Sequence, residues 1–389
     1  MDINRKLPVW ALILIDILLV AAIILPFAYF HHVRDMWGPD DEQAKHSYTH
    51  GETPDVLTGD VFLTADASTE PSPTTGPSDD PTTRSAQEIR PVSLKGDREI
   101  RAYAKEHGLT LPAAVDGASY DMLYRSENIF TVLYSAAEKL NGYLAKYYVF
   151  DVYVKDVRNF YTVNSKQKGL RELVSEGEKE FGGPVVAAVN GDYSSNKNHC
   201  RVVVRNGKLY RTPEIIDSDV CVMYYDGRIE TYTPEEFDFS KVEAQSPYQI
   251  WNFGPELLDK SGRAKTEFND EAYDRHILKN THPRTALGYY APGHYCLIVV
   301  DGRQNGEDGE YLYGCSAISL AQLCERIGCV RAYNMDGGDS SQAYMNGEDV
   351  RIDRTRDPQR VLSDIICVGE IAPSLQRDEP EKTDAGGAE

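Results

Sequence analysis

Apolar runs alternate with charged, turn-rich segments along the middle of the chain. The runs at 185–189 and 295–300 are apolar throughout, which is typical of strands covered on both faces, and 330–335 forms a third such candidate. The segments 168–181 and 316–327 have the apolar spacing of amphipathic helices, and glycines follow both. The alternation predicts an α+β fold, with a mixed β-sheet flanked by helices and hairpins.

Shorter elements complete this pattern. Strands are predicted at 129–134 and 147–154, where aromatic and β-branched residues are dense. Asn-Gly at 206–207 and Asp-Gly at 226–227 each separate two apolar runs, so each predicts a hairpin. A short helix is expected at 98–108, within the linker or at the edge of the core.

The N-terminal segment has a different pattern. Residues 7–30 are apolar except for Asp16, and this length suffices to cross a hydrocarbon core of roughly 30 Å as a helix. No small-residue cleavage site follows, so we expect an uncleaved signal-anchor. Arg5 and Lys6 precede it, which predicts a single-pass protein of the cell membrane with a cytoplasmic N-terminus and an extracellular catalytic domain.

Composition divides the remaining chain. The net charge of −20 falls mostly in a Thr-, Pro- and Ser-rich acidic linker and in an acidic tail, which disfavours nucleic acid as a partner. We therefore expect a cytoplasmic end with anchor at 1–34, a disordered linker at 35–119, one folded domain at 120–369 and a disordered tail at 370–389.

Seven cysteines lie in the predicted domain, and their odd number leaves at least one unpaired within the chain. Cys324 and Cys329 flank the end of a predicted helix, which makes them candidates for a disulfide. Buried thiols are the expectation for most of the others.

Polar clusters follow all three buried strands. The chain reads Asn190-Gly-Asp192 after the first strand, Asp301-Gly-Arg303 after the second and Asp336-Gly-Gly-Asp339 after the third. Loops at the ends of rigid central strands commonly carry chemistry, so we expect these side chains to meet in one cleft.

The third cluster is the richest in chemical groups. Asp336 is a candidate acid or base. Gly337 and Gly338 would let a ligand approach the main chain, with free N–H groups forming a nest for an anion. Ser340 and Ser341 would bind sugar or phosphate oxygens. The competing interpretation of this stretch is a tight turn in which the aspartate caps its own backbone.

Two arginines, and carboxylates of the polar clusters, indicate two kinds of ligand, phosphate and a metal cation. Arg284 and Arg303 suit bidentate recognition of phosphate, although a surface ion pair is the simpler interpretation of either one alone. Asp192, Asp336 and Asp339 could instead hold calcium, but their spacing matches no EF-hand loop. Because P-loop and GxGxxG patterns are absent, we expect no nucleotide cofactor. We also expect that no metal is required.

Several blocks of the sequence, in order over about residues 120–369, resemble the phosphodiester glycosidase family, which includes the uncovering enzyme and bacterial exopolysaccharide biosynthesis proteins. The blocks are VAAVNGDYS (186–194), VVVRNGKLYR (202–211), FGPELL (253–258), HPRTALGY (282–289), LIVVDGRQ (297–304), SLAQLCERIGCVRAYNMDGGDSSQAYMNGE (319–348) and RVLSDIICV (360–368).

The resemblance implies hydrolysis of a sugar-1-phosphodiester at the glycosidic bond, within cell-surface polysaccharide or exopolysaccharide metabolism, with a phosphate-linked glycan as substrate. With the reasoning above, it assigns catalysis to Asp336, Asp301 and Asp192. It assigns substrate binding to Asn190, Arg284, Thr285, Arg303, Gly337, Gly338, Ser340, Ser341 and Arg360.

The chain departs from the family at its most diagnostic stretch. The family usually reads Asp-Gly-Gly-Gly-Ser-Ser-Thr, whereas here Asp339 replaces the third glycine and Gln342 replaces the threonine. A carboxylate beside a phosphate site weakens anion binding unless an arginine or a cation offsets it. The alternative function is accordingly a glycan-binding or scaffold module without catalysis.

Overall fold

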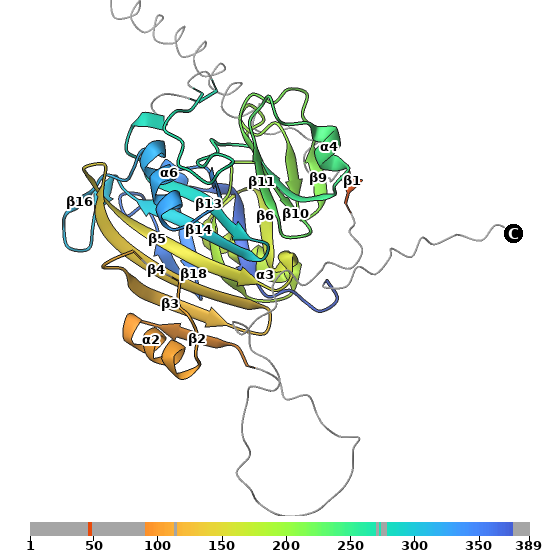
Figure 1. Cartoon of the computed structure of the whole chain (residues 1–389). Helices are drawn as coiled ribbons and strands as arrows, with labels where there is room; N and C mark the ends of the chain where they lie inside the picture. Colours follow the sequence, from red (N-terminus) through yellow and green to blue (C-terminus); the bar gives the residue numbers. More distant parts are fainter. Residues whose placement is uncertain (1–45, 49–89, 113–114, 270–271, 274–277, 376–389) are drawn as a thin grey trace, which may run out of the picture.

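The computed structural model describes residues 46–48, 90–112, 115–269, 272–273 and 278–375 (Figure 1). Its strands, α-helices and 3-10 segments (η) are, in order, β1 His46–Ser47, β2 Val92–Lys95, α2 Asp97–Glu106, β3 Ser119–Arg125, β4 Ile129–Leu140, β5 Tyr143–Val154, η4 Val157–Asn159, β6 Phe160–Lys168, α3 Leu170–Phe181, β7 Val185–Asn190, β8 Val203–Arg205, β9 Lys208–Arg211, β10 Val220–Tyr224, β11 Ile229–Tyr232, α4 Phe239–Glu243, β12 Pro247–Trp251, β13 Arg284–Ala291, β14 His294–Asp301, β15 Gln304–Asn305, β16 Tyr311–Leu312, α6 Ala317–Arg326, β17 Arg331–Asn334, η5 Gly338–Ser340, β18 Ala343–Met345, β19 Glu348–Arg351 and β20 Leu362–Gly369.

The strands form three main sheets and one two-stranded ribbon. Their orders are β17-β13-β14-β5-β4-β3-β2, β19-β18-β7-β20-β6 and β1-β9-β8-β12-β10-β11, with β15-β16 as the ribbon. We expected a single mixed sheet, whereas the pairs between these described strands are antiparallel. The α+β expectation holds at the coarser level of several sheets with few helices.

All three main sheets contribute side chains to the largest hydrophobic core. Strand β14 contributes Leu297 and Val299 to this core, while the alternate residues Ile298 and Val300 enter a second core that includes residues of α6. Helix α3 covers the other face of the five-stranded sheet through a third core. Apolar residues at successive positions are therefore explained by burial on both faces of a strand.

The central position that we predicted for three strands holds for two of them. Strands β7 and β14 each have neighbours on both sides, but β17 lies at the edge of the seven-stranded sheet. The segment 255–257 covers this edge, since Leu257 N–H donates to Ala332 O and Asn334 N–H donates to Pro255 O. Strand β17 is thus largely buried without being central.

The folded body begins earlier than the predicted boundary at residue 120. Strand β2 pairs with β3, and α2 buries Ile100 and Ala104 against the body, so this part of the expected linker is ordered. Strand β1 also pairs with β9. Short apolar stretches inside a polar segment gave too weak a sequence signal to reveal these pairings.

Most local predictions agree with the structure. The hairpins at 206–207 and 226–227 join β8 to β9 and β10 to β11. Helices α3 and α6 fall within the predicted helical segments, and α2 begins one residue before its predicted segment. Strands β4 and β5 are longer than expected and form a hairpin through Asn141-Gly142, a turn signal that our prediction overlooked.

Two further expectations concern the membrane and the cysteines. In the part of the chain that the structure describes, no helix combines the length and the apolar character needed to cross a bilayer, and the predicted span 7–30 lies outside that part. All seven cysteines are buried free thiols, so the candidate bridge between Cys324 and Cys329 is not formed. Instead, the sulfur of Cys329 lies 3.5 Å from that of Cys296.

Candidate active site

The polar clusters predicted from the sequence lie at the ends of strands in the seven-stranded and five-stranded sheets. Strands β7, β14 and β17 end there, while β13 and β20 begin there because they run antiparallel to their neighbours. This geometry places Arg284, the first residue of β13, opposite Val300 near the end of β14. Residues distant in the sequence therefore meet at these strand ends.

A cavity of about 290 Å³ opens at these strand ends; we call it the main cavity. Its size is near the lower limit for small-molecule sites. A second, much smaller cavity of about 10 Å³ adjoins it and shares Asp336, Ser340 and Arg360. The main cavity is lined by Phe253, His282, Arg284, Arg303, Asn334, Met335, Asp336, Gly337, Gly338, Asp339, Ser340 and Arg360.

Asp336 is half-buried in this cavity on a rigidly held backbone. Its N–H donates to Gly191 O at 3.1 Å, and its carbonyl accepts from Asn190 Nδ2 at 2.7 Å. Burial raises the pKa of its carboxyl, although hydrogen bonds from Ser340 and from the N–H of Gly337 oppose the increase. A carboxyl with a raised pKa can exchange protons nearer to neutral pH, as acid–base chemistry requires.

Asn190 and Thr285 act behind Asp336. Thr285 is fully buried and lines neither cavity; its Oγ1 donates to Asn190 Oδ1 at 2.7 Å. Gln342 N–H donates to the same oxygen, and its Nε2 donates to Arg360 O at 2.8 Å. The glutamine at the family's threonine position therefore helps to fix the backbone of Arg360.

The two glycines do not form the predicted anion nest. Gly337 N–H donates to Asp336 Oδ1 at 2.8 Å and Gly338 N–H donates to Pro283 O at 2.9 Å, so both donors are already used. Their contribution is steric and conformational. A Cβ at Gly337 would lie 3.0 Å from Pro283 O, and Gly338 has a φ of 63°.

The two serines have different positions. Ser340 lines both cavities and hydrogen-bonds to Asp336. Ser341 is fully buried and lines neither cavity, and its carbonyl accepts a hydrogen bond from Arg351 Nη1. Of this pair, only Ser340 is placed to touch a ligand.

Three arginines face the main cavity. Arg284 is buried, and it donates to the carbonyls of Cys315 at 3.1 Å and Asn280 at 3.2 Å. Burial, and secondarily the charge of Arg303, lower the pKa of Arg284 to about 10, which leaves it charged at neutral pH. With Arg360, these cations give the cavity the charge that phosphate recognition needs.

Asp339, the departure from the family's third glycine, is offset by arginines. Its carboxylate lies 3.6 Å from Arg303 Nη1 and 3.4 Å from Arg356 Nη2. Arg303 also hydrogen-bonds to His282 Nδ1, which acts as the acceptor because a guanidinium carries only donors. The condition under which an extra carboxylate is compatible with anion binding is met.

Asp301 lies behind the cavity, not on its surface. It is fully buried and lines neither cavity. Its carboxylate accepts from Arg351 Nε at 3.1 Å, from Arg354 Nη2 at 3.4 Å and from the side chain of Gln304. Since Arg351 also binds Ser341 O, Asp301 supports the loop that carries Asp336.

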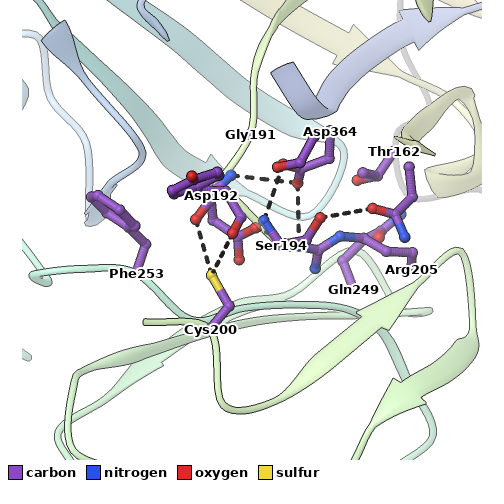
Figure 2. Close-up of polar contacts among 12 residues, drawn as sticks. Thr162, Gly191, Asp192, Ser194, Cys200, Arg205, Gln249, Phe253 and Asp364 are labelled. Carbon is purple, nitrogen blue, oxygen red and sulfur yellow. Dashed lines mark hydrogen bonds and ion pairs between the residues drawn. The ribbon is translucent and has the colours of Figure 1, made fainter. Parts of the chain in front are cut away.

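Asp192 is likewise enclosed, in an ionic cluster with Arg205 and Asp364 that we call the buried triad (Figure 2). Arg205 Nη2 lies 2.5 Å from Asp192 Oδ1 and 3.2 Å from Asp364 Oδ2. Asp192 also accepts from Asn252 N–H at 2.8 Å. These contacts occupy its carboxylate, and it lines neither cavity.

Asp364 connects the buried triad to the site. It lines the smaller cavity beside Asp336, and its carbonyl accepts from Gly191 N–H at 3.0 Å. A Cβ at Gly191 would lie 2.2 Å from Asp364 Oδ2, so only glycine fits there. Burial and the nearby charge of Asp192 raise the pKa of Asp364 to about 7.

The sequence interpretation overlooked several residues that shape the site. Arg351, Arg354 and Arg356 belong to a ten-residue segment with four arginines, an overlooked signal of charge clustering. Phe253 lies in the quoted block FGPELL but received no role. Asn334 and Asp364 also lie in quoted blocks, at 319–348 and 360–368, but received no role, because single polar residues near strand ends are common.

The calcium alternative finds no matching ligand set. Among the described residues, no group of three or more His, Cys, Asp or Glu side chains is placed to hold a metal ion. Asp192 and Asp339 are both engaged by arginines.

Comparison with known proteins bears directly on this site. Residues 183–369 match the family model described as phosphodiester glycosidase. Over this segment the chain is similar to that family. The segment includes Asp336, all three arginines of the main cavity and the buried triad. The match supports a glycosidase-type hydrolase.

Individual relatives are more distant. The SPbeta prophage-derived uncharacterized protein YomE of Bacillus subtilis is 27% identical over 167 residues, which is 42% of this chain and 24% of that protein. The chain thus spans about a quarter of the length of this curated relative.

Two solved structures are similar to part of the chain. The zebrafish N-acetylglucosamine-1-phosphodiester alpha-N-acetylglucosaminidase catalytic domain has a TM-score of 0.49 and 17% identity, covering 63% of this chain and 84% of that one. A hypothetical protein from Synechocystis has a TM-score of 0.47 and 12% identity, covering 64% of this chain and 63% of that one.

Proposed function

We propose that the chain hydrolyses a sugar-1-phosphodiester at its glycosidic bond, releasing the sugar and leaving a phosphomonoester on the other partner. The observation that carries this proposal is that Asp336 lines the main cavity together with Arg284, Arg303 and Arg360. A carboxyl group can act on the anomeric side while the guanidinium groups hold the phosphate. The family match supports the same reaction class.

The chemistry of the leaving group determines which catalytic roles fall to Asp336 and which fall to the arginines. A phosphomonoester has a second pKa of about 6, so its departure depends more on charge stabilisation than on a strong proton donor. Arg303 and Arg360 supply that stabilisation. Asp336 then acts at the anomeric carbon or on the attacking water, and the C1–oxygen bond breaks while the bridging oxygen stays on phosphorus.

Isotope labelling tests the bond that breaks. The folded body is incubated in H₂¹⁸O with the methyl diester of glucose-1-phosphate or of N-acetylglucosamine-1-phosphate. We expect ¹⁸O in the released sugar and none in methyl phosphate, observed by mass spectrometry and ³¹P NMR. Simple p-nitrophenyl glycosides should remain intact, because the arginines find no anion in them. Label in the phosphate would contradict glycosidic cleavage.

The alternative of a scaffold without catalysis was based on the extra negative charge of Asp339 beside the phosphate site. Asp339 pairs with Arg303 and Arg356, and these pairs offset that charge. The scaffold alternative would still be favoured if the body hydrolysed none of these diesters and bound an anionic glycan with an affinity unchanged by Asp336→Asn.

We also propose that the body lies outside the cell, held by a membrane anchor at residues 7–30, and acts in exopolysaccharide or cell-surface polysaccharide metabolism. The support is the apolar span preceded by Arg5 and Lys6. Protease added to intact cells should remove the body and spare an N-terminal tag. Protection of the body would reverse this topology.

A further inference from the structure

The main cavity has two chemically different ends. Arg303, Gly338 and Asp339 form one end, where a Cβ on Gly338 would lie 3.4 Å from Arg303 Nη1. Phe253 and Asn334 lie together at the other end: Asn334 pairs with Ala286 inside β13 and donates to Gly254 O, whereas Gly338 and Arg303 contact Pro283 and His282, which precede that strand. One end is cationic and the other combines an aromatic ring with an amide.

Asp336 lies between these ends along the chain. Asn334 and Asp336 are two residues apart, so their Cα atoms are separated by at most about 7 Å, roughly the width of one sugar ring. Gly338 and Asp339 follow on the far side of Asp336. The order is therefore aromatic and amide groups, then the carboxyl, then the arginine.

Phe253 is held in place by its backbone. Its N–H donates to Tyr333 Oη at 2.8 Å, and the carbonyl of the next residue, Gly254, accepts from Asn334 Nδ2 at 2.8 Å. The ring is half-buried, with part of its surface on the cavity. A flat apolar surface fixed in this way suits the C–H face of a pyranose ring.

Asn334 offers a hydrogen-bond acceptor. Its Nδ2 donates to Gly254 O and to Met335 O, and these two carbonyls fix the orientation of the amide. Its Oδ1 is buried and has no partner among the described residues, although the residue borders the cavity. A buried acceptor of this kind favours a ligand that brings an O–H or N–H donor.

We infer that the sugar of the substrate binds against Phe253 and Asn334, with its phosphate directed toward Arg303. The assignment rests on the proposed function and adds the direction of the substrate. The ring packs on Phe253, a sugar hydroxyl or amide N–H donates to Asn334 Oδ1, and C1 faces Asp336. Phe253 and Asn334 are accordingly substrate-binding residues that select the sugar.

Binding measurements test this direction without needing turnover. Calorimetry with the whole protein compares methyl phosphate, glucose-1-phosphate and N-acetylglucosamine-1-phosphate. The wild type should bind at least one sugar phosphate more tightly than methyl phosphate. Phe253→Leu should remove that advantage, a loss of about three- to tenfold, and leave methyl phosphate affinity within about twofold.

Matched variants separate the two ends. Arg303→Ala should weaken methyl phosphate and the sugar phosphates alike, and Asn334→Ala should act as Phe253→Leu does. Phe237→Leu, at a half-buried aromatic residue outside the cavity, should change none of the affinities. Thermal unfolding checks that each variant is folded.

The direction is overturned if Phe253→Leu weakens methyl phosphate as much as the sugar phosphates, or if it changes neither. It is also overturned if the wild type binds no sugar phosphate more tightly than methyl phosphate. Failure of the labelling experiment alone would instead remove the proposed hydrolysis and leave these binding results to decide the direction.

Discussion

Two clusters of aspartate and arginine lie near the same end of the sheets, yet their surroundings differ. In the buried triad, the single guanidinium of Arg205 lies between Asp192 and Asp364, and all three side chains are at most 1% exposed. In the main cavity, three arginines accompany Asp336 and Asp339, and several of these side chains reach solvent.

The difference shows what distinguishes a charged cluster that stabilises the fold from one that can bind a ligand. In the buried triad one guanidinium is shared by two carboxylates, and the three side chains are engaged with one another instead of facing the main cavity. In the cavity the arginines outnumber the carboxylates, and the excess positive charge faces open space. An aspartate after a strand is therefore not a catalytic signal by itself. Its charged partners and its exposure determine whether it can act on a ligand.

The largest effect is expected from breaking the buried triad. Arg205→Met leaves two buried carboxylates without their cation and should lower the free energy of unfolding by about 3–5 kcal/mol, measured by urea denaturation. Arg201→Met is the matched control, because the Arg201–Asp217 pair is exposed; it should cost less than about 1 kcal/mol. Equal losses would contradict the distinction.

Asp336 and Asp301 should respond in opposite ways. Asp336→Asn should reduce turnover at least roughly a hundredfold, because the acid–base or nucleophilic group is lost. Its stability should be kept or raised at neutral pH, since burial already disfavours the charged form. Asp301→Asn should instead lower the free energy of unfolding by about 2 kcal/mol, because Arg351 loses its buried carboxylate.

Steady-state kinetics and denaturation of both variants provide the measurement. A stable Asp301→Asn protein without turnover would move Asp301 into the chemistry. An Asp336→Asn protein with normal turnover would exclude Asp336 from it.

Asp364 should make stability depend on pH. Its pKa is about 7 in the folded protein and about 3.9 when unfolded, so the folded state holds more protons between these values. The resulting stabilisation is fully present below about pH 4 and is lost as the pH rises through 7. Asp364→Asn should flatten this dependence by at least about 1 kcal/mol, measured by denaturation across that range. An unchanged slope would contradict the raised pKa.

Arg284→Lys tests the deepest cation of the cavity. Lysine keeps the charge but loses the planar fork that binds Cys315 O and Asn280 O. We expect KM to rise roughly tenfold with a smaller change in kcat, measured with a sugar phosphodiester. A fall in kcat at constant KM would instead place Arg284 in the transition state alone.

The smallest effect is expected at Asp339. Asp339→Gly restores the family's usual glycine and frees Arg303 and Arg356, whose pairs with Asp339 are partly exposed. Anion affinity should rise by no more than about fivefold, and less at high salt. A loss of affinity would show that Asp339 contributes directly to ligand binding.

Much of the local structure could be predicted from the sequence, because its causes are local. Apolar runs, glycine stops and Asn-Gly or Asp-Gly turns located most strands, helices and hairpins. The same information could not separate a central strand from β17, since coverage of its edge by residues 255–257 depends on distant chain segments.

The candidate site divides in the same way. The order of residues already placed Asp336, Arg284, Arg303 and neighbouring glycines at the ends of buried strands, and their residue types suggested phosphate binding and carboxyl chemistry. That Asp192 and Asp301 lie behind the cavity could be learned only from the folded chain. Asp192 pairs with Arg205 13 residues away, and Asp301 pairs with Arg351 and Arg354, which are 50 and 53 residues away. Asp192 N–H also contacts Asp364, 172 residues away, and no local pattern encodes these contacts.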